Sequence, residues 1–348
     1  MDYDPSVLTA AQVTAEARAA QVVAQPAFTL AQYLPDRTNP SLSFNFDKSQ
    51  TSLPRAASYR SFDAEADFGS TEGGESSSGR IPPMSRKLRI DEYDTLVQQI
   101  DGGEILRETY LRYTRRIAGE FQTRVELARG QSLEFGQVTL NERKLKATID
   151  FGRKASHSVV AATLWSNTAA DILGDLTAWD AVYVASNGSK WADVLVSSQT
   201  LAFMQRNVGI IKAALGRGSD LPSIISVDAV QSVLDAYRLG RLVVNDEQVV
   251  DANGVQTRVI SANKVVFVAS SSSVSLSGDV GTVLGGVDWG FTAESASPKY
   301  GISAGERAGI FGGVFSDNDP EGRYVLLSAT ALPVLENANL TFAAQVAA

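Results

Sequence analysis

The stretch GRIPPMSRKLRIDEYDTLVQQIDGGEILRETYLRYTRRIAGE, residues 79–120, changes halfway from the pattern of a strand to that of a helix. In its second half and just beyond, apolar residues recur at intervals of three or four, which places them on one helix face. They are Leu106, Tyr110, Tyr113, Ile117, Phe121, Val125 and Ala128. Asp101 with Glu104 is typical of a capping box, and Gly130 is a stop signal. We therefore predict a helix of about 26 residues within 101–129, roughly 39 Å long at a rise of 1.5 Å per residue.

The first half of the stretch predicts one arm of a long hairpin. From 84 to 90, polar residues recur at every second position, as in a strand. An acidic run of the same period lies at 62–68, and the Gly/Ser-rich segment 67–80 connects the two runs. Because opposite charges would face each other across an antiparallel pair, we predict that the two runs pair. A lone two-stranded ribbon is marginally stable, so this one needs another surface to lie on.

The opposite face of the predicted helix is strongly charged. It carries Glu108, Arg112, Arg115, Arg116, Glu120 and Arg124. The simpler interpretation is a solvated face with ion pairs at i,i+4, such as Glu108–Arg112 and Glu120–Arg124. The alternative is a face turned toward anionic material.

Composition limits the class of protein. The 348 residues are 44% hydrophobic and 20% charged, which supports a folded chain with a sizeable core and more than one lobe. The absence of Cys excludes disulfides, thiol nucleophiles and Cys-type metal sites. Neither a secretory signal nor an apolar run of ~20 residues occurs, so no membrane span is predicted. The net charge of −8 argues weakly against a dedicated nucleic-acid binder.

No motif in the sequence predicts a catalytic residue, a cofactor or a metal site. The only histidine, His157, cannot build a two-His zinc site, and we interpret it as a structural residue. No phosphate-binding glycine motif or nucleophile elbow is present. The run 317–322 begins like a calcium loop, but Ser328 stands where the loop needs Glu, so we predict a hairpin turn.

The rest of the chain divides by pattern. Residues 1–58 are broken by five prolines and read as an arm with one helix, at 9–24, and no core residues. A strand pair is predicted at 135–151. Residues 166–308 mix strands with helices as a compact α/β lobe, and strands close the chain from 309. The helices are predicted at 168–186, at 198–207 and from a cap at Ser226 to about 238.

In order, the chain thus has an arm, a charged hairpin with a Gly/Ser tip, a long helix, a strand pair, an α/β lobe and closing strands. This order resembles the major capsid proteins of tailed double-stranded DNA phages, the Hong Kong 97-type fold, and most closely the lambda-type (protein E) family. The resemblance rests on residues 79–120, on WADVLVSSQTLAFMQRN at 191–207 and on the strand-rich end, and it covers about 59–346. It implies an α+β fold and a structural protein, not an enzyme.

The resemblance assigns a part of the capsid fold to each region. These parts would be the N-terminal arm at 1–58, the E-loop hairpin at 59–92, the peripheral domain with its spine helix at 93–165, the α/β axial domain at 166–308, and strands returning to the peripheral domain at 309–348. The E-loop would lie across a neighbouring subunit, and its Gly/Ser tip would bend to follow that neighbour. Its contact residues would be Phe62, Asp63, Glu65, Asp67, Phe68, Arg80, Arg86, Lys87 and Arg89. The spine helix of the family lies toward the shell interior, which makes Arg112, Arg115, Arg116 and Arg124 candidates for contact with DNA.

The same resemblance implies partners and a location. The chain would form pentamers and hexamers that close into an icosahedral shell around double-stranded DNA, with scaffolding, portal and decoration proteins as further partners. It would be made in the bacterial host cytoplasm and reside in the virion capsid. We predict neither a fused, cleaved scaffolding domain nor covalent cross-links. The alternatives are an encapsulin-like compartment for protein cargo, a carboxylate-dependent hydrolase and a surface-binding β protein; a monomer at high concentration would favour the last two.

Overall fold

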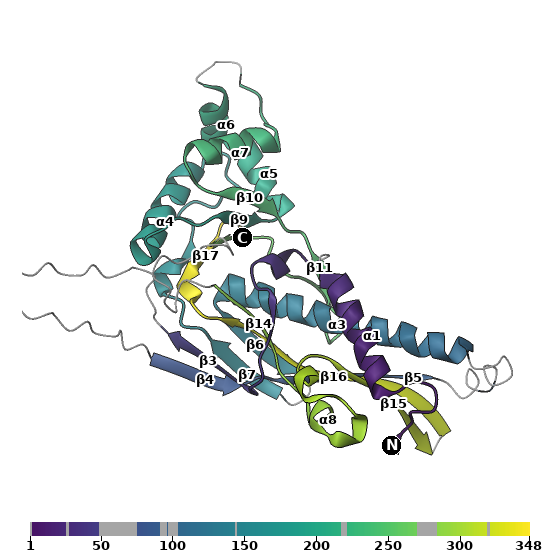
Figure 1. Ribbon diagram of the computed structural model, residues 1–348. Helices are drawn as coiled ribbons and strands as arrows, with labels where there is room; N and C mark the ends of the chain where they lie inside the picture. Colours follow the sequence, from purple (N-terminus) through teal and green to yellow (C-terminus); the bar gives the residue numbers. More distant parts are fainter. Residues whose placement is uncertain are drawn as a thin grey trace, which may run out of the picture.

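The computed structural model describes residues 2–25, 28–48, 75–90, 96, 104–142, 145–216, 221–269, 284–318 and 321–348. It shows an elongated body and a lobe that stands on the body (Figure 1). The helix α3 (Glu104–Phe135) runs along the body beside a sheet. The body and the lobe each have a large hydrophobic core.

The body sheet has six strands, with the order β1–β15–β16–β14–β2 and β5 paired to β16. Their bounds are β1 (Asp2–Tyr3), β2 (Asp36–Thr38), β5 (Pro83–Ile90), β14 (Gly285–Trp289), β15 (Phe311–Asn318) and β16 (Glu321–Leu335). The long strand β16 organises the sheet, because β15 and β5 flank its first part and β14 pairs with residues 331–335. The hairpin predicted at 317–322 is confirmed, since Asn318 pairs with Glu321.

The predicted long helix is present but continues past its predicted stop. At 32 residues α3 is about 48 Å long. It ends at Phe135, before Gly136, whose φ is +66°. The stop predicted at Gly130 is therefore wrong. Glycine at position 130 allows the helix backbone to pass close to Val259, because a Cβ on residue 130 would lie 2.1 Å from the Val259 carbonyl oxygen.

The lobe sheet separates the two cores. Its order is β10–β9–β13–β17–β8, formed by β8 (Ser158–Val160), β9 (Asp193–Val196), β10 (Arg241–Val244), β13 (Lys264–Val268) and β17 (Thr341–Gln345). Along β13, Val265 and Phe267 belong to the lobe core, whereas Val266 and Val268 belong to the body core. Both faces are thus buried, which explains the continuous apolar run in the sequence.

Four helices cover the outer side of the lobe sheet (Figure 1). They are α4 (Ile172–Asn187), α5 (Ser198–Arg206), α6 (Val208–Leu215) and α7 (Val227–Ala236). Each begins at a residue whose side chain accepts a backbone N–H of the first turn, including Ser226, the predicted cap of α7. Sequence patterns predicted α4, α5 and α7 but missed α6.

Three two-stranded ribbons and several short helices complete the described residues. The ribbons pair β3 (Ser43–Lys48) with β4 (Glu75–Arg80), β6 (Gln137–Glu142) with β7 (Leu145–Asp150), and β11 (Gln248–Val250) with β12 (Gln256–Arg258). The second ribbon is the predicted strand pair. The short helices are η2 (Thr29–Gln32), η3 (Ala155–His157), α8 (Ala293–Ala296), η4 (Pro298–Tyr300), η5 (Ala304–Glu306) and η6 (Ala338–Leu340).

The N-terminal segment is part of the body core, which corrects the prediction of an arm without core residues. The predicted helix is present as α1 (Ala10–Ala24), with Thr9 and Gln12 in a capping box. Buried residues of the segment in the body core include Leu8, Val13, Ala17, Leu30, Leu34, Phe44 and Phe46. Apart from the piece that forms α1, the pieces between prolines are too short to show a period, yet Leu30 with Leu34 and Phe44 with Phe46 reach the same core from two of them.

Strand pairing also departs from the predicted division of the chain. The last strand, β17, belongs to the lobe sheet, although residues 309–348 were assigned to the peripheral part. Conversely, β14 lies in the body sheet, although 166–308 were assigned to the lobe. The strand at 84–90 pairs with β16 as β5, so it has a partner distant in sequence.

Candidate functional site

The ribbon of β3 and β4 joins the two ends of a long segment of the chain. Lys48 pairs with Glu75, so the residues that flank the segment 49–74, itself outside the described residues, lie opposite each other on the ribbon. Phe44 lies across Gly79, where a Cβ would meet the ring at 2.4 Å. Phe44 and Phe46 also belong to the body core, so the ribbon is packed on the body. The predicted contact residues Phe62, Asp63, Glu65, Asp67 and Phe68 lie outside the described residues.

Strand β5 brings the predicted basic residues together, but their partners are in the body. The Nε atom of Arg86 lies 2.6 Å from a carboxylate oxygen of Glu120 on α3. The Nζ atom of Lys87 lies 5.0 Å from the centre of the Tyr324 ring on β16. Arg89 lies beside Gly322, where an added Cβ would be 2.8 Å from its Nε atom. The basic side chains therefore attach β5 to its own subunit.

Arg80, the remaining residue predicted at the E-loop contact, is the last residue of β4. It lines a hollow of about 380 Å³ together with Leu42, Phe291 and Thr330. The hollow lies where the ribbon joins β5, because Ile81 and Pro83 line it as well. It is the larger of two surface depressions around the start of β5.

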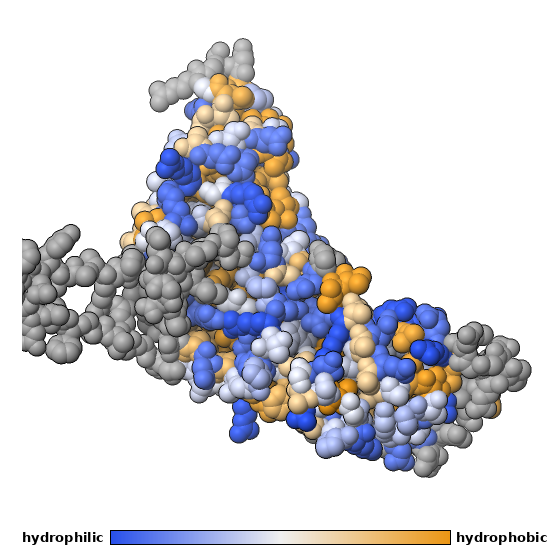
Figure 2. Space-filling model, in the orientation of Figure 1, coloured by the Kyte–Doolittle hydropathy of each residue, from blue (hydrophilic) through white to orange (hydrophobic). Residues whose placement is uncertain are grey.

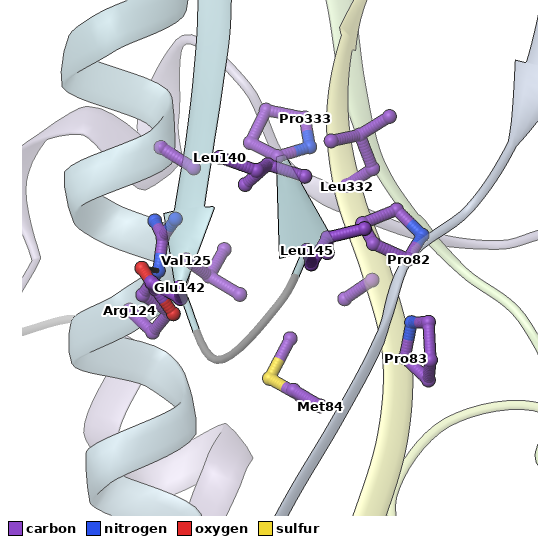
Figure 3. A pocket seen from close by; sticks show the side chains of 12 residues that line it. Pro82, Pro83, Met84, Arg124, Val125, Leu140, Glu142, Leu145, Leu332 and Pro333 are labelled. Atoms are coloured by element: carbon purple, nitrogen blue, oxygen red, sulfur yellow. Dashed lines mark hydrogen bonds and ion pairs between the residues drawn. The ribbon is translucent and has the colours of Figure 1, made fainter. Parts of the chain in front are cut away.

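The smaller depression, of about 60 Å³, is mainly apolar (Figure 3). Pro82 and Met84 face Leu145 and Leu332 across it. An ion pair between Arg124 and Glu142 forms one edge, with 2.8 Å between Nε and Oε1. The Glu142 carboxylate is thus paired to a guanidinium. This arrangement suits a small apolar group and offers no activated acid or nucleophile.

The predicted DNA-facing arginines of α3 lie among carboxylates. Arg115 contacts Glu16 of α1 at 2.5 Å and Glu108 at 3.2 Å. Hydrogen bonding to Glu16 raises the pKa of the Arg115 guanidinium. Arg116 pairs with Glu120 at 3.5 Å. Most of the positive charge on this face is therefore neutralised within the subunit.

The ion pairs proposed from sequence for this face are not the ones formed. Glu108 pairs with Arg115 rather than with Arg112, and Glu120 pairs with Arg116 rather than with Arg124. Arg112 instead lies over the ring of Tyr113, with 5.7 Å between the guanidinium carbon and the ring centre. Residues on α1 and β6 account for the difference, because they supply carboxylates that helix spacing alone does not reveal.

His157 is buried in the lobe core. Its Nδ1 atom lies 3.1 Å from the carbonyl oxygen of Thr341, and the rings of Tyr183 and Phe342 pack near it. Burial lowers its pKa, so the ring is neutral at physiological pH. The described ranges hold no group of three acidic or histidine residues placed to bind a metal ion.

The lobe exposes apolar side chains at its outer end. Hydrophobic residues gather along one edge of the lobe in Figure 2. The exposed ones on α6, α7 and their connections are Val208, Leu215, Ile224, Val227 and Tyr237, each at least 41% exposed. Within the part of the chain that the structure describes, no helix is both long and apolar enough to cross a membrane.

Sequence reasoning missed a charged cluster between the lobe and α3. Glu126 and Arg129 are fully buried, and they pair with each other at 2.9 Å. Both lie next to the apolar stripe of α3, beside Val125 and Ala128, and that position was the available signal. Their partners come from the N-terminal segment, which carried no expectation of burial.

Comparison with known proteins gives one family and one fold. The sequence profile of the family described as "Phage major capsid protein E" matches residues 9–346. The putative capsid protein of a prophage from E. coli CFT073 is similar in structure, with a TM-score of 0.65 and 14% identity over 98% of this chain and 99% of that one. A phage-related protein from Bordetella bronchiseptica RB50 has a TM-score of 0.56 and 13% identity over 99% and 98%. No curated protein matches in sequence.

The structural likeness extends over almost the full length of both chains, so it concerns the whole fold. It confirms the predicted Hong Kong 97-type capsid fold, with α3 as the spine helix. The family profile leaves out only a few residues at each end. The chain therefore belongs to the phage major capsid protein E family.

Proposed function

We propose that this structural capsid protein forms pentamers and hexamers that close into an icosahedral shell around the double-stranded DNA genome of a phage. The observation that carries the proposal is the family match over residues 9–346, on a chain with the fold of a prophage capsid protein. The family places the protein in the virion capsid. A structural role also agrees with the two surface depressions, whose carboxylates have partners: Glu142 pairs with Arg124, and Glu294 accepts from the Ser328 hydroxyl.

Two surfaces are the proposed contacts between subunits. The first is the loop of residues 49–74 beyond the β3–β4 ribbon, which would reach a neighbouring subunit. The second is the exposed apolar edge of α6 and α7, which would meet its copies around the fivefold and sixfold axes. Burying such side chains between copies releases about 25 cal/mol per Å² of apolar surface.

The face of α3 that carries Arg112 and Arg115 is the proposed interior face. Because Glu16 and Glu108 neutralise much of its charge, contact with DNA would be weak, non-specific and sensitive to salt. Such a face leaves packaged DNA free to slide during filling. Scaffolding, portal and decoration proteins are proposed partners by family membership alone.

Assembly of the purified protein tests the proposal. The chain would be produced alone and together with the scaffolding protein of its own genome, then examined by sedimentation and negative-stain electron microscopy. We expect closed shells in at least one condition, and particles from infected cells that contain DNA. Particles that hold protein cargo and no DNA would identify an encapsulin-like compartment instead. A monomer under all scaffold and salt conditions would refute a shell of either kind.

A further inference from the structure

Residues 29–36, here called the strap, pass between α3 and the lobe and are bound to both. On the helix side, Glu126 accepts the backbone N–H of Leu30 at 2.8 Å. Arg129 donates from Nε to the carbonyl oxygen of Leu34 at 3.0 Å. The strap is thus held by backbone groups that any sequence would offer, and the helix supplies the specific side chains.

The helix residues that hold the strap are buried charges. Glu126 and Arg129 have no exposed surface, and a second nitrogen of Arg129 lies 2.5 Å from the carboxylate of Asp36. Buried charges are tolerated only when they are paired and hydrogen-bonded. If the strap moved away, Glu126 and Arg129 would each lose a partner at this site.

The other side of the strap is bound to the lobe. The hydroxyl of Tyr33 donates to Asp193 of β9 at 2.7 Å. Thr29 accepts a hydrogen bond from Asn245, and its own hydroxyl lies 3.5 Å from a carboxylate oxygen of Glu247. Asn245 and Glu247 lie between β10 and β11, so the strap joins the lobe sheet at its outer strand.

A separate set of contacts fixes the end of α3 to the lobe. Glu134 accepts the backbone N–H of Ser261 at 2.9 Å and pairs with Lys264 at 3.1 Å. Arg153 donates to the carbonyl oxygens of Leu133 and Glu134 at the helix end. Glu134 is about 12 Å along the helix from Glu126. The lobe therefore contacts α3 at several places, including the approach of Val259 to Gly130, and only the contact near Glu126 passes through the strap.

We propose that the strap is a pH-sensitive tie, which holds the lobe against α3 below neutral pH and loosens above it, while the end of α3 serves as the pivot. Two carboxylates contact adjacent residues of the strap: Glu126 of α3 accepts from the Leu30 amide, and Glu247 of the lobe lies 3.5 Å from the Thr29 hydroxyl. When both are charged they repel each other. A proton on Glu247 removes that repulsion.

The environment of Glu247 sets the pH range of the tie. Burial, and then the charge of Glu126, raise its pKa from 4.5 to about 7. The charged groups that face it are Glu126 and Arg129, both from α3, and the strap adds the uncharged Thr29. The pKa of Glu247 in the folded protein is above its usual value. The stabilisation that a neutral Glu247 gives to the bound strap is therefore complete below about pH 4.5 and is lost as the pH rises through about 7.

Hydrogen–deuterium exchange of the full, unassembled chain at about pH 6 and about pH 8 tests the proposal, with labelling times scaled for the intrinsic rate of amide exchange. We expect the protection of the strap, including the Leu30 amide, to fall by up to about tenfold between these conditions. The Glu247→Gln variant should show no such fall. Glu142→Gln, which removes a paired carboxylate on β6, should behave as wild type. An equal fall in Glu247→Gln, or none in wild type, would overturn the proposal.

A second variant separates the tie from general loosening of the lobe. Tyr33→Phe removes the hydrogen bond to Asp193, so strap exchange should rise at least about fivefold at both pH values and keep its pH dependence. The amide of Ser261, at the pivot, should stay protected throughout. If Ser261 loses protection in parallel with the strap, the lobe opens as a whole and the strap is not a separate element. The result does not depend on whether shells form.

Discussion

Gly130 and Val259 meet backbone to backbone, so closely that a Cβ on residue 130 would lie 2.1 Å from the Val259 carbonyl oxygen. Gly130 belongs to α3, and Val259 follows β12 at the base of the lobe. This contact sets how near the lobe can approach the long helix. It also explains why a glycine, which is unfavourable inside a helix, occurs at position 130 of α3.

Gly130→Ala should therefore destabilise the protein. The clash involves a backbone oxygen that cannot rotate away, and overpacking of this kind costs about 1–3 kcal/mol. Gly119→Ala is the matched control in the same helix, because an added Cβ there meets no atom within 4 Å. It should stabilise by about 0.5–1 kcal/mol. Denaturant unfolding measures both; stabilisation in the two variants alike would mean that the approach to Val259 is not a constraint.

The N-terminal segment should contribute strongly to stability. Leu8 is 1% exposed in the body core, and Leu8→Ala should cost about 2–5 kcal/mol of unfolding free energy. Val23, at the end of α1, is 80% exposed, and Val23→Ala should change stability by less than about 0.5 kcal/mol. Thermal unfolding of the two variants distinguishes a core segment from a loosely attached arm. Equal, small effects of the two substitutions would instead support the interpretation of the segment as an arm without core residues.

The loop of residues 49–74 should matter for assembly and little for folding. Lys48 and Glu75 are directly opposite, so an Asn-Gly turn can replace the whole loop and close the ribbon. We expect the unfolding temperature of the isolated subunit to change little, whereas shell formation fails. Electron microscopy and calorimetry on the same preparation provide the measurement. Shells formed at wild-type yield would show the loop to be a passive connection.

Arg112 is the most informative position for contact with DNA, because it lies over Tyr113 while Arg115 and Arg116 pair with carboxylates. Arg112→Glu should reduce the DNA content of purified particles and lower the salt dependence of DNA binding by about one unit of slope per lost phosphate contact. Arg206→Glu, on α5 of the lobe, is the control and should leave both unchanged. Identical DNA content in the two variants would mark the α3 face as merely solvated.

Sequence patterns correctly predicted the helices, strands and caps that depend only on interactions between residues near each other in the chain. The body of α3, the β6–β7 ribbon, α1 and the Ser226 cap of α7 all follow from spacing or from hydrogen bonds within a few residues. The predicted end of α3 was wrong because residue 130 is glycine for a different reason, namely its close contact with Val259, a residue far along the chain. A stop signal and a close-contact glycine are identical in sequence.

The failures at the candidate site have a common cause, which is partner choice over long distance. Charge favoured pairing of 84–90 with the acidic run at 62–68, which lies outside the described residues; the charge pattern did not reveal that β5 pairs with β16, which aligns it beside Glu120. The burial of Glu126 and Arg129 was not predicted, because charged residues on helices usually are exposed. Only the strap, brought from the N-terminal segment, makes their burial tolerable.

The pairing of Asp2 with Ser316 has a consequence for how the chain is made. At about 5–20 residues per second, the ribosome releases the first strand long before its partner exists. The lobe sheet is also completed late, because β17, which pairs with both β13 and β8, comes from residues 341–345. Neither core closes until residues 341–345 have been made. Nascent chains on one messenger therefore cannot present finished subunit surfaces to each other before that point.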